Sequence, residues 1–148
     1  MARAGFTNHV IAAMKAKVGE AHIEGALQRL EAKADNARRH DPIVYYMRMD
    51  RLVKIGTSRN IFVRASTIMP QGILAVEWGA RAKERDRHSQ FIEHHSHGEW
   101  YWLREPLWAH IHELREAATT TLGMSVETWL HHQGIRYGQI VSPLGEFE

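Results

Sequence analysis

The segment that follows Pro42 constrains the fold most, because it holds two β-rich runs with a polar turn between them. Residues 43–47 read Ile-Val-Tyr-Tyr-Met, residues 52–56 read Leu-Val-Lys-Ile-Gly, and Asp50-Arg51 lies between the runs. β-Branched and aromatic residues fit the pleated surface of a strand, and two such runs around a short polar turn are typical of a hairpin. The sequence therefore predicts a β-hairpin at the start of a domain. Asp41-Pro42 marks the boundary, since the residue before proline is pushed out of the helical region.

Helical and extended patterns alternate after the hairpin. Thr57, Ser58 and Asn60 are suitable N-caps for the next element. The predicted elements are a helix to about residue 67, a strand over 73–78, a helix over 80–94, an extended aromatic run over 99–103, a helix from Pro106 to about 119 and a short helix over 125–133. We therefore expect an α/β (α+β) fold in which a small three-stranded antiparallel sheet is flanked by helices. Its domain would span residues 42–119, and residues 120–148 would form a C-terminal short helix and tail.

Residues 1–41 are expected to form an N-terminal helical extension. Residues 8–39 contain no proline and carry apolar residues at helical spacing, with Val10, Met14 and Val18 in one row. The segment would be one long helix, or two with a break near Gly19 and Gly25, because glycine weakens a helix interior. The remaining helix surface is charged, so the apolar stripe must pack on the main domain, on a partner or on another copy of the chain. A homo-oligomer formed through this helix is therefore one hypothesis.

Composition excludes several classes of protein. The chain has 148 residues, which suffices for one domain with an accessory helix, and it has no cysteine for disulfides or thiolate metal sites. No stretch approaches the roughly 20 apolar residues that span a bilayer, and the N-terminus lacks the apolar run of a secretory signal. We therefore expect no membrane partner and a cytoplasmic location.

Charge is unevenly distributed along the chain. The basic residues between Tyr45 and Thr67 are Arg48, Arg51, Lys54, Arg59 and Arg64, and Asp50 is the single acid there. From Glu99 onward, three arginines face seven glutamates. A basic segment of this size could contact a phosphate backbone, which makes DNA a candidate partner with Arg48, Arg51 and Arg59 as contacts. The alternative is a set of solvated arginines on a hairpin.

The order strand, strand, helix, strand, helix, together with the residues in it, resembles the GIY-YIG nuclease superfamily. Ile43-Val44-Tyr45 stands where that family has Gly-Ile-Tyr, and Lys54-Ile55-Gly56 stands where it has Tyr-Ile-Gly or Tyr-Val-Gly. Arg64 and Glu84 stand near the family's helix arginine and metal-binding glutamate. The Val-Tyr-Tyr, Lys-Ile-Gly and Gly-Glu-Trp motifs are similar to those of a short phage and bacterial branch. The resemblance covers close to half of the chain. It implies a metal-dependent DNA endonuclease in the cytoplasm of a bacterial or phage-infected cell.

The resemblance also implies roles for single residues. Glu84 would anchor one divalent ion, Mg²⁺ or Mn²⁺, because hard cations prefer carboxylate oxygen. Arg64 would clamp the scissile phosphate through its forked donors. Tyr45 would orient or deprotonate the attacking water, and Lys54 would share that task or act as a fixed positive charge. The residues expected to support the site are Tyr46, Gly56 and His88.

Each of these assignments has a structural alternative. Tyr45 could be a core residue, Arg64 a surface ion-pair partner, and Glu84 part of a solvated helix face. A zinc site is a less favoured interpretation of the histidines His88, His94, His95 and His97. Glu99 and Trp100 are expected to have a structural role. Four tryptophans are expected to fill the core, namely Trp78, Trp102, Trp108 and Trp129, although one exposed ring among them could stack on a base. At the level of function, the alternatives are a nucleic-acid-binding module with little or no catalysis and an oligomeric assembly protein.

Overall fold

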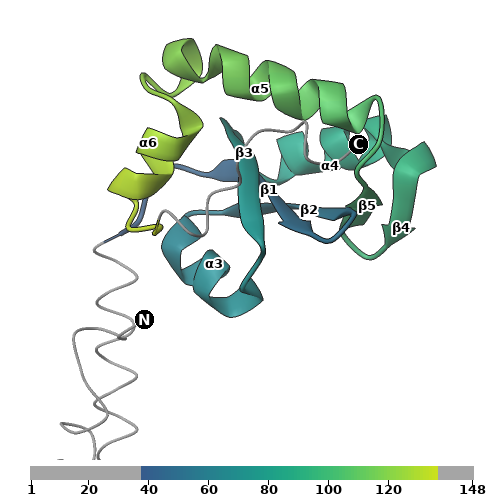
Figure 1. The fold of residues 1–148 in the computed structure, drawn as a ribbon, viewed down its shortest axis with the longest axis horizontal. Coiled ribbons are helices and arrows are strands. Elements are labelled where there is room, and N and C mark those ends of the chain that lie inside the picture. Colours follow the sequence, from purple (N-terminus) through teal and green to yellow (C-terminus); the bar gives the residue numbers. More distant parts are fainter. Residues whose placement is uncertain (1–37, 137–148) are drawn as a thin grey trace, which may run out of the picture. The chain divides into compact units, whose positions relative to one another are not determined.

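The structure is a computed structural model that describes residues 38–136 (Figure 1). Residues 1–37 and 137–148 lie outside the described residues. The first range holds almost all of the N-terminal extension predicted for residues 1–41, so the extension and the self-association predicted for it stay predictions. The described domain forms a compact unit that begins at His40. Within residues 38–136, no helix has the length and apolar character needed to cross a membrane.

The domain belongs to the α+β class, with strands and helices in the order that the sequence predicts up to α4. Helix α4 ends at Gln90, four residues earlier than expected, and a short 3₁₀ turn follows it. The elements are β1 (Ile43–Met49), β2 (Leu52–Ser58), α3 (Ile61–Ile68), β3 (Gly72–Trp78), α4 (Arg81–Gln90), η1 (Ile92–His94), β4 (His95–His97), β5 (Trp100–Trp102), α5 (Leu107–Thr121) and α6 (Val126–His132).

The sheet has five antiparallel strands in the order β3-β1-β2-β5-β4, so the prediction of a three-stranded sheet was wrong. The two additional strands form a small hairpin that turns at Gly98, whose φ of +51° favours glycine. This hairpin extends the sheet because Leu52 pairs with Trp102 and Lys54 pairs with Trp100. Its strands are three residues long, which is too short to leave a periodic signal in the sequence.

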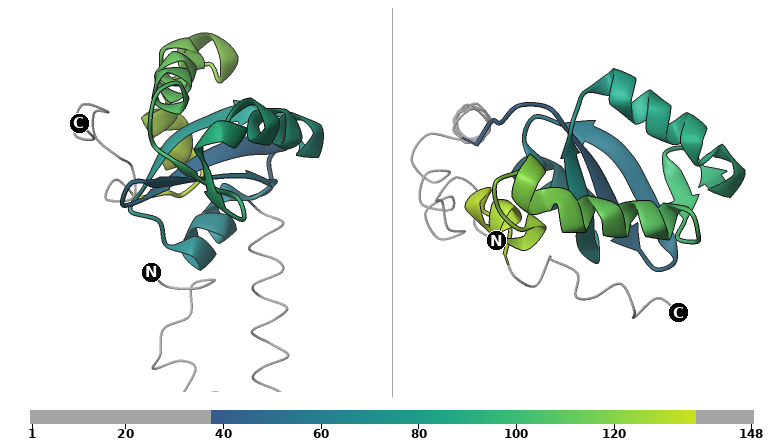
Figure 2. Two further views of the ribbon diagram at one scale, coloured as in Figure 1. Left: turned by 90° about the vertical axis from the view of Figure 1, so that its right-hand side faces the viewer. Right: turned by 90° about the horizontal axis from the view of Figure 1, so that it is seen from above.

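Two hydrophobic cores lie on opposite faces of the sheet, because neighbouring residues of a strand point to opposite sides. Tyr45 belongs to the core shared with α3, α6 and the end of α5, whereas Tyr46 belongs to the core shared with the start of α5. Figures 1 and 2 show α4 and α5 over one face of the sheet and α3 over the other. Helix α6 adds Val126, Trp129 and Leu130 to the Tyr45 core.

Local signals fix the helix starts. The side chain of Asn60 accepts a hydrogen bond from the Val63 amide at the start of α3, and Ser125 does the same for Thr128 in α6.

The tryptophans differ in how deeply they are buried. Trp129 is buried as expected, and Trp108 is partly buried against the Tyr46 core. The expectation was wrong for Trp78, which is 39% exposed at the end of β3, and for Trp102, which is half-buried and belongs to neither core.

Candidate functional site

A cavity of about 390 Å³ opens beside β2, and residues from β1, β2, α3, α4 and the turn before β5 line it. All four residues to which the sequence assigns catalytic roles, from four separate elements, are among its lining residues. The structure therefore brings together a phenol, an ammonium, a guanidinium and a carboxylate. The lining consists of Tyr45, Lys54, Thr57, Arg64, Arg81, Glu84, Arg85 and Glu99.

The edge of β2 explains how α4 and the turn before β5 reach this cavity. Strand β5 pairs with β2 only along residues 52–54, so the outer edge of β2 beyond Lys54 needs other hydrogen-bond partners. The Ile55 amide donates to the Glu99 carbonyl over 3.0 Å, and the Ile55 carbonyl accepts from Nε2 of His88 over 2.8 Å. These two hydrogen bonds on a single residue hold Glu99 and His88 near each other at the outer edge of β2.

Gly56 is required by the position of Tyr45. The two residues are direct partners in the β1–β2 pairing, and the tyrosine ring lies over the glycine. A Cβ atom at position 56 would lie 2.6 Å from Cζ of Tyr45, closer still to its hydroxyl oxygen, and 3.2 Å from Oε2 of Glu99. The absence of a side chain at this position therefore lets the phenol and the Glu99 carboxylate approach each other.

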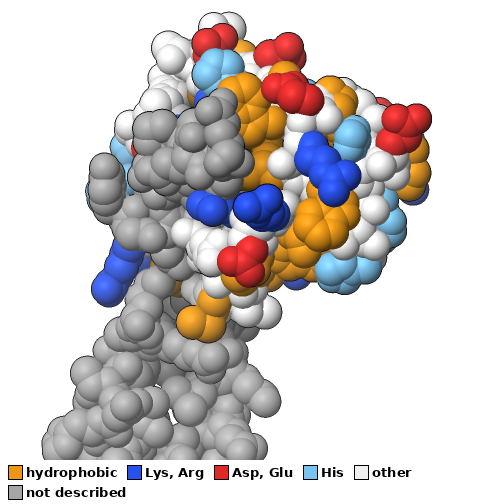
Figure 3. Space-filling model, turned by 45° about the vertical axis from the view of Figure 1, so that its right-hand side comes forward, with side chains coloured by type: hydrophobic (Ala, Val, Ile, Leu, Met, Phe, Trp, Pro, Cys, Tyr) orange, Lys and Arg blue, Asp and Glu red, His pale blue; other side chains and the backbone are white. Residues whose placement is uncertain are grey.

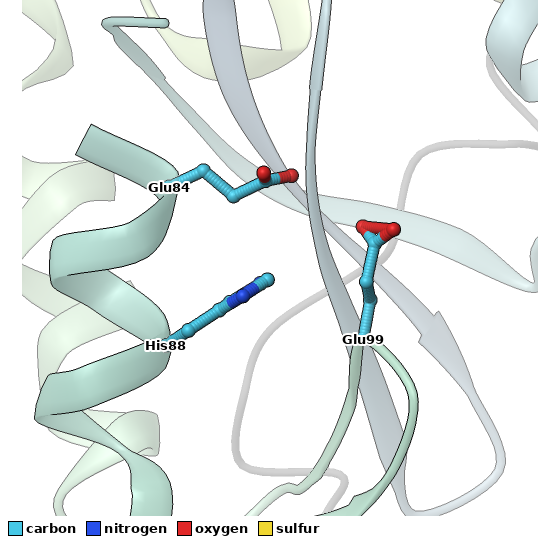
Figure 4. A group of neighbouring side chains, drawn as sticks. All are labelled: Glu84, His88 and Glu99. Carbon is cyan, nitrogen blue, oxygen red and sulfur yellow. The ribbon is translucent and has the colours of Figure 1, made fainter. Parts of the chain in front are cut away.

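Glu84, His88 and Glu99 form a compact group of possible metal ligands. One ligand atom from each lies within 4.8 Å of the other two. Figure 4 shows Glu84 and His88 projecting from α4 toward Glu99, which comes from the opposite side. A backbone carbonyl can only accept, so Nε2 of His88 donates to Ile55 and a neutral ring keeps its lone pair on Nδ1. Metal-binding histidines commonly have this outer hydrogen bond, and two carboxylates with one imidazole suit a divalent cation.

The cavity holds two adjacent carboxylates among several basic side chains. Burial and the neighbouring Glu99 carboxylate raise the pKa of Glu84. Burial raises the pKa of Tyr45 to about 12, with Arg64 opposing this shift and the two glutamates adding to it. Two adjacent carboxylates repel each other unless a proton or a cation lies between them. The basic side chains in the lining, Lys54, Arg64, Arg81 and Arg85, also make the cavity suitable for an anionic group.

Several sequence-predicted residues lie outside the cavity lining. Arg48 donates through Nε to the Asp50 carbonyl at the hairpin turn, and neither it nor Arg51 nor Arg59 lines the cavity. Figure 3 shows that on the face in view the basic side chains lie in small groups with hydrophobic side chains between them. The predicted contact of these arginines with DNA stays a prediction.

Tyr46, expected to support the site, lies on the opposite face of the sheet in a buried polar network. Its hydroxyl donates to Oε2 of Glu77 over 2.5 Å and lies 3.0 Å from Nε2 of His110. Arg87 forms a bidentate pair with Glu77, over 3.0 and 2.8 Å. Burial alone would raise the pKa of Glu77, but hydrogen bonds from His110, Arg87 and Tyr46 lower it to about 2. These satisfied hydrogen bonds indicate a structural role that holds β1, β3, α4 and α5 together.

Sequence analysis missed the position of Glu99. A structural role was expected for it, whereas its carboxylate lines the cavity beside Glu84. The signal was the Gly98-Glu99-Trp100 motif, because a glycine turn before a strand can present a carboxylate at a sheet edge.

The other histidines do not support the zinc hypothesis. Among the histidines of residues 38–136, His88 is the one that belongs to a group of possible metal ligands. His95 contacts the Gly98 carbonyl, and His97 contacts the Ser96 hydroxyl.

Comparisons of the chain with protein-family models, with curated proteins and with solved structures find no match. Function is therefore inferred from the chemistry and geometry of the cavity.

Proposed function

We propose that this protein is a metal-dependent DNA endonuclease of GIY-YIG type, which hydrolyses a phosphodiester bond in the cavity beside β2. One observation carries the proposal. Tyr45, Lys54, Arg64 and Glu84 come from β1, β2, α3 and α4 and line one cavity of about 390 Å³. Hydrolysis of a phosphodiester needs an oriented water, cations around the phosphate and support for the leaving oxygen, and these side chains are of the required types.

The residues present fit a single Mg²⁺ or Mn²⁺ ion. Glu84 and Glu99 offer oxygen ligands, and His88 offers Nδ1 because its other nitrogen donates to Ile55. When bound, the ion would supply Lewis-acid stabilisation of the charge that develops on the phosphate. Burial and the neighbouring Glu99 carboxylate raise the pKa of Glu84, and a cation between the two carboxylates would relieve their repulsion.

The other side chains have separate roles in the proposal. Arg64 would bind the scissile phosphate through its forked donors, and Lys54 would add a second positive charge from β2. Tyr45 would orient the attacking water rather than deprotonate it, because a phenol with a pKa of about 12 is neutral at pH 7. Arg81 and Arg85, one turn apart on α4, would hold a neighbouring phosphate of the DNA strand.

Cleavage of supercoiled plasmid tests the proposal. With Mg²⁺ or Mn²⁺ the protein should nick or linearise the plasmid, and EDTA should stop the reaction. Glu84→Gln and Glu99→Gln should reduce cleavage at least about 100-fold, because each removes a charged ligand from the ion. Glu93→Gln is the matched control, since Glu93 is exposed in η1 and does not line the cavity. Equal cleavage by Glu84→Gln and the control would exclude this mechanism.

A DNA-binding module without turnover is the second candidate. The sequence favours it at two positions, because Ile43 and Lys54 replace the first glycine and the second tyrosine of the family pattern. Binding of DNA with a steep salt dependence, and no nicks with either ion, would support this alternative.

A further inference from the structure

Two tryptophans of β5 lie on the same sheet face as the candidate site but outside both hydrophobic cores. Trp100 is the cross-strand partner of Lys54, and Trp102 is the partner of Leu52. Directly paired residues point to the same side of a sheet, and Lys54 is itself paired with Met47 on the Tyr45 side. Tyr101, between the two tryptophans, points the other way into the opposite core. Trp100 and Trp102 are half-buried and belong to neither core.

Each of these rings has a cation over it. Nζ of Lys54 lies 5.6 Å from the centre of the Trp100 ring, and Cζ of Arg104 lies 5.2 Å from the centre of the Trp102 ring. His97 of β4 stacks on Trp100 with an angle of 20° between the ring planes. Partly exposed aromatic rings with cations beside them are a combination that binds single-stranded nucleic acid, since bases stack on the rings and phosphates pair with the cations.

This strip, defined as Lys54, Trp100, Trp102 and Arg104, is continuous with the cavity. Lys54 both lines the cavity and lies over Trp100, so it links the phosphate-sized site to the aromatic rings. Arg104 extends the strip from the far side of Trp102, next to the backbone of Arg51, whose carbonyl accepts from the Leu103 amide over 2.8 Å. The spacing of residues two apart in a strand, about 6.5 to 7 Å, is close to the spacing of successive nucleotides in an extended strand.

We propose that the strip binds the single-stranded DNA that flanks the scissile phosphate, with a base stacked on Trp102 and the phosphates paired with Lys54 and Arg104. The inference rests on the proposed function and specifies its substrate as a strand with unpaired bases, such as a flap, a gap or a melted segment. Paired bases are stacked within the duplex and present no ring face to a tryptophan. A fully paired strand would therefore contact the cations of the strip but not its aromatic rings.

Binding in EDTA tests this inference separately from cleavage. Fluorescence anisotropy would measure the affinity of the full chain for a labelled 15-nucleotide oligo(dT) and for a blunt-ended duplex of 15 base pairs. Trp102→Leu keeps an apolar side chain but loses the π-face, so it should weaken oligo(dT) binding at least about fivefold and change duplex binding less than about twofold. Trp102→Phe should restore part of the loss. Trp108→Leu is the matched control, because Trp108 lies on α5 and packs against the opposite core.

Intrinsic fluorescence provides a readout that needs no substitution. Oligo(dT) should quench the tryptophan emission of the unmodified protein, and Trp102→Leu should remove part of that quenching. Unchanged oligo(dT) affinity in Trp102→Leu, or equal losses for oligo(dT) and duplex, would overturn the inference, as would the absence of quenching at saturating oligo(dT). None of these outcomes bears on cleavage, which requires the ion. If Glu84→Gln loses cleavage but keeps its affinity for oligo(dT), both proposals are supported. If the unmodified protein binds oligo(dT) through Trp102 but never cleaves DNA, the proposed function alone is contradicted.

Discussion

Tyr45 and Gly56 are direct partners across β1 and β2, and the tyrosine ring occupies the space that any side chain at position 56 would need. This relationship places the phenol of a buried residue in the cavity. It also links two parts of the sequence pattern. The glycine of Lys54-Ile55-Gly56 leaves the space that the ring of Tyr45 occupies on the neighbouring strand.

Gly56→Ala should displace Tyr45 and disrupt the cavity. The new Cβ would lie 2.6 Å from Cζ of Tyr45, and the neighbouring atoms belong to a ring that the core holds in place. We expect a loss of about 1 to 3 kcal/mol in the free energy of unfolding, and loss of cleavage, because overpacking forces a ring or the backbone to move. Urea unfolding and the plasmid assay would measure the two effects. Gly123→Ala serves as a control for glycine substitution, since a Cβ there meets no atom within 4 Å although its φ of +81° adds some strain.

Glu84→Gln should stabilise the metal-free protein while abolishing metal binding. The pKa of Glu84 is raised by burial and by Glu99, so its contribution to stability is greatest below the ordinary pKa and declines as the pH rises through the raised value. A neutral amide removes this repulsion, and we expect a gain of a few tenths to about 1 kcal/mol at pH 7 after solvent screening is considered. Thermal unfolding with EDTA and calorimetric titration with Mn²⁺ would test both parts. A loss of stability with metal binding retained would contradict the assignment.

Tyr45→Phe should reduce cleavage far more than stability. The substitution keeps the ring in the core and removes only the hydroxyl, so the free energy of unfolding should change by less than about 1 kcal/mol. The rate of cleavage should fall about 100-fold, chiefly in kcat, if the phenol orients the attacking water. Because the pKa of Tyr45 is about 12, its ionisation should add no step to the pH profile between pH 7 and 9. A fully active Tyr45→Phe would leave the tyrosine with a packing role alone.

Glu77→Gln should destabilise the fold and leave the cavity unaffected. Glu77 is 7% exposed and is held by Tyr46, Arg87 and His110. Its pKa is lowered from 4.5 to about 2, so its contribution to stability is complete above pH 4.5 and is lost as the pH falls toward 2. We expect a loss on the order of 2 kcal/mol at pH 7, and the gap from the unmodified protein should narrow below pH 4. Urea unfolding at both pH values would measure this, and Mn²⁺ affinity should stay unchanged.

The sequence by itself determined the elements that depend on local interactions. The hairpin runs, the Asn60 and Ser125 caps and the order of the first elements follow from residues close together in the chain. The resemblance to a known family, carried by this order of elements, selected Tyr45, Lys54, Arg64 and Glu84, and all four line one cavity. Such signals survive in a single sequence because capping, turn chemistry and strand alternation act over a few residues.

Only the tertiary structure decided which distant groups meet. The five-stranded sheet depends on the pairing of β5 with β2 and of β4 with β5. The aromatic run over 99–103 was expected to be extended, but its partner strand β2 is distant in the sequence. The place of Glu99 depends on the same pairing, since its carbonyl and Nε2 of His88 both bond to Ile55 at the outer edge of β2. Long-range hydrogen bonds at a sheet edge have no counterpart in the local pattern of residues. The Gly98-Glu99-Trp100 motif marks a turn before a strand, but for that physical reason only the folded chain places the Glu99 carboxylate beside Glu84.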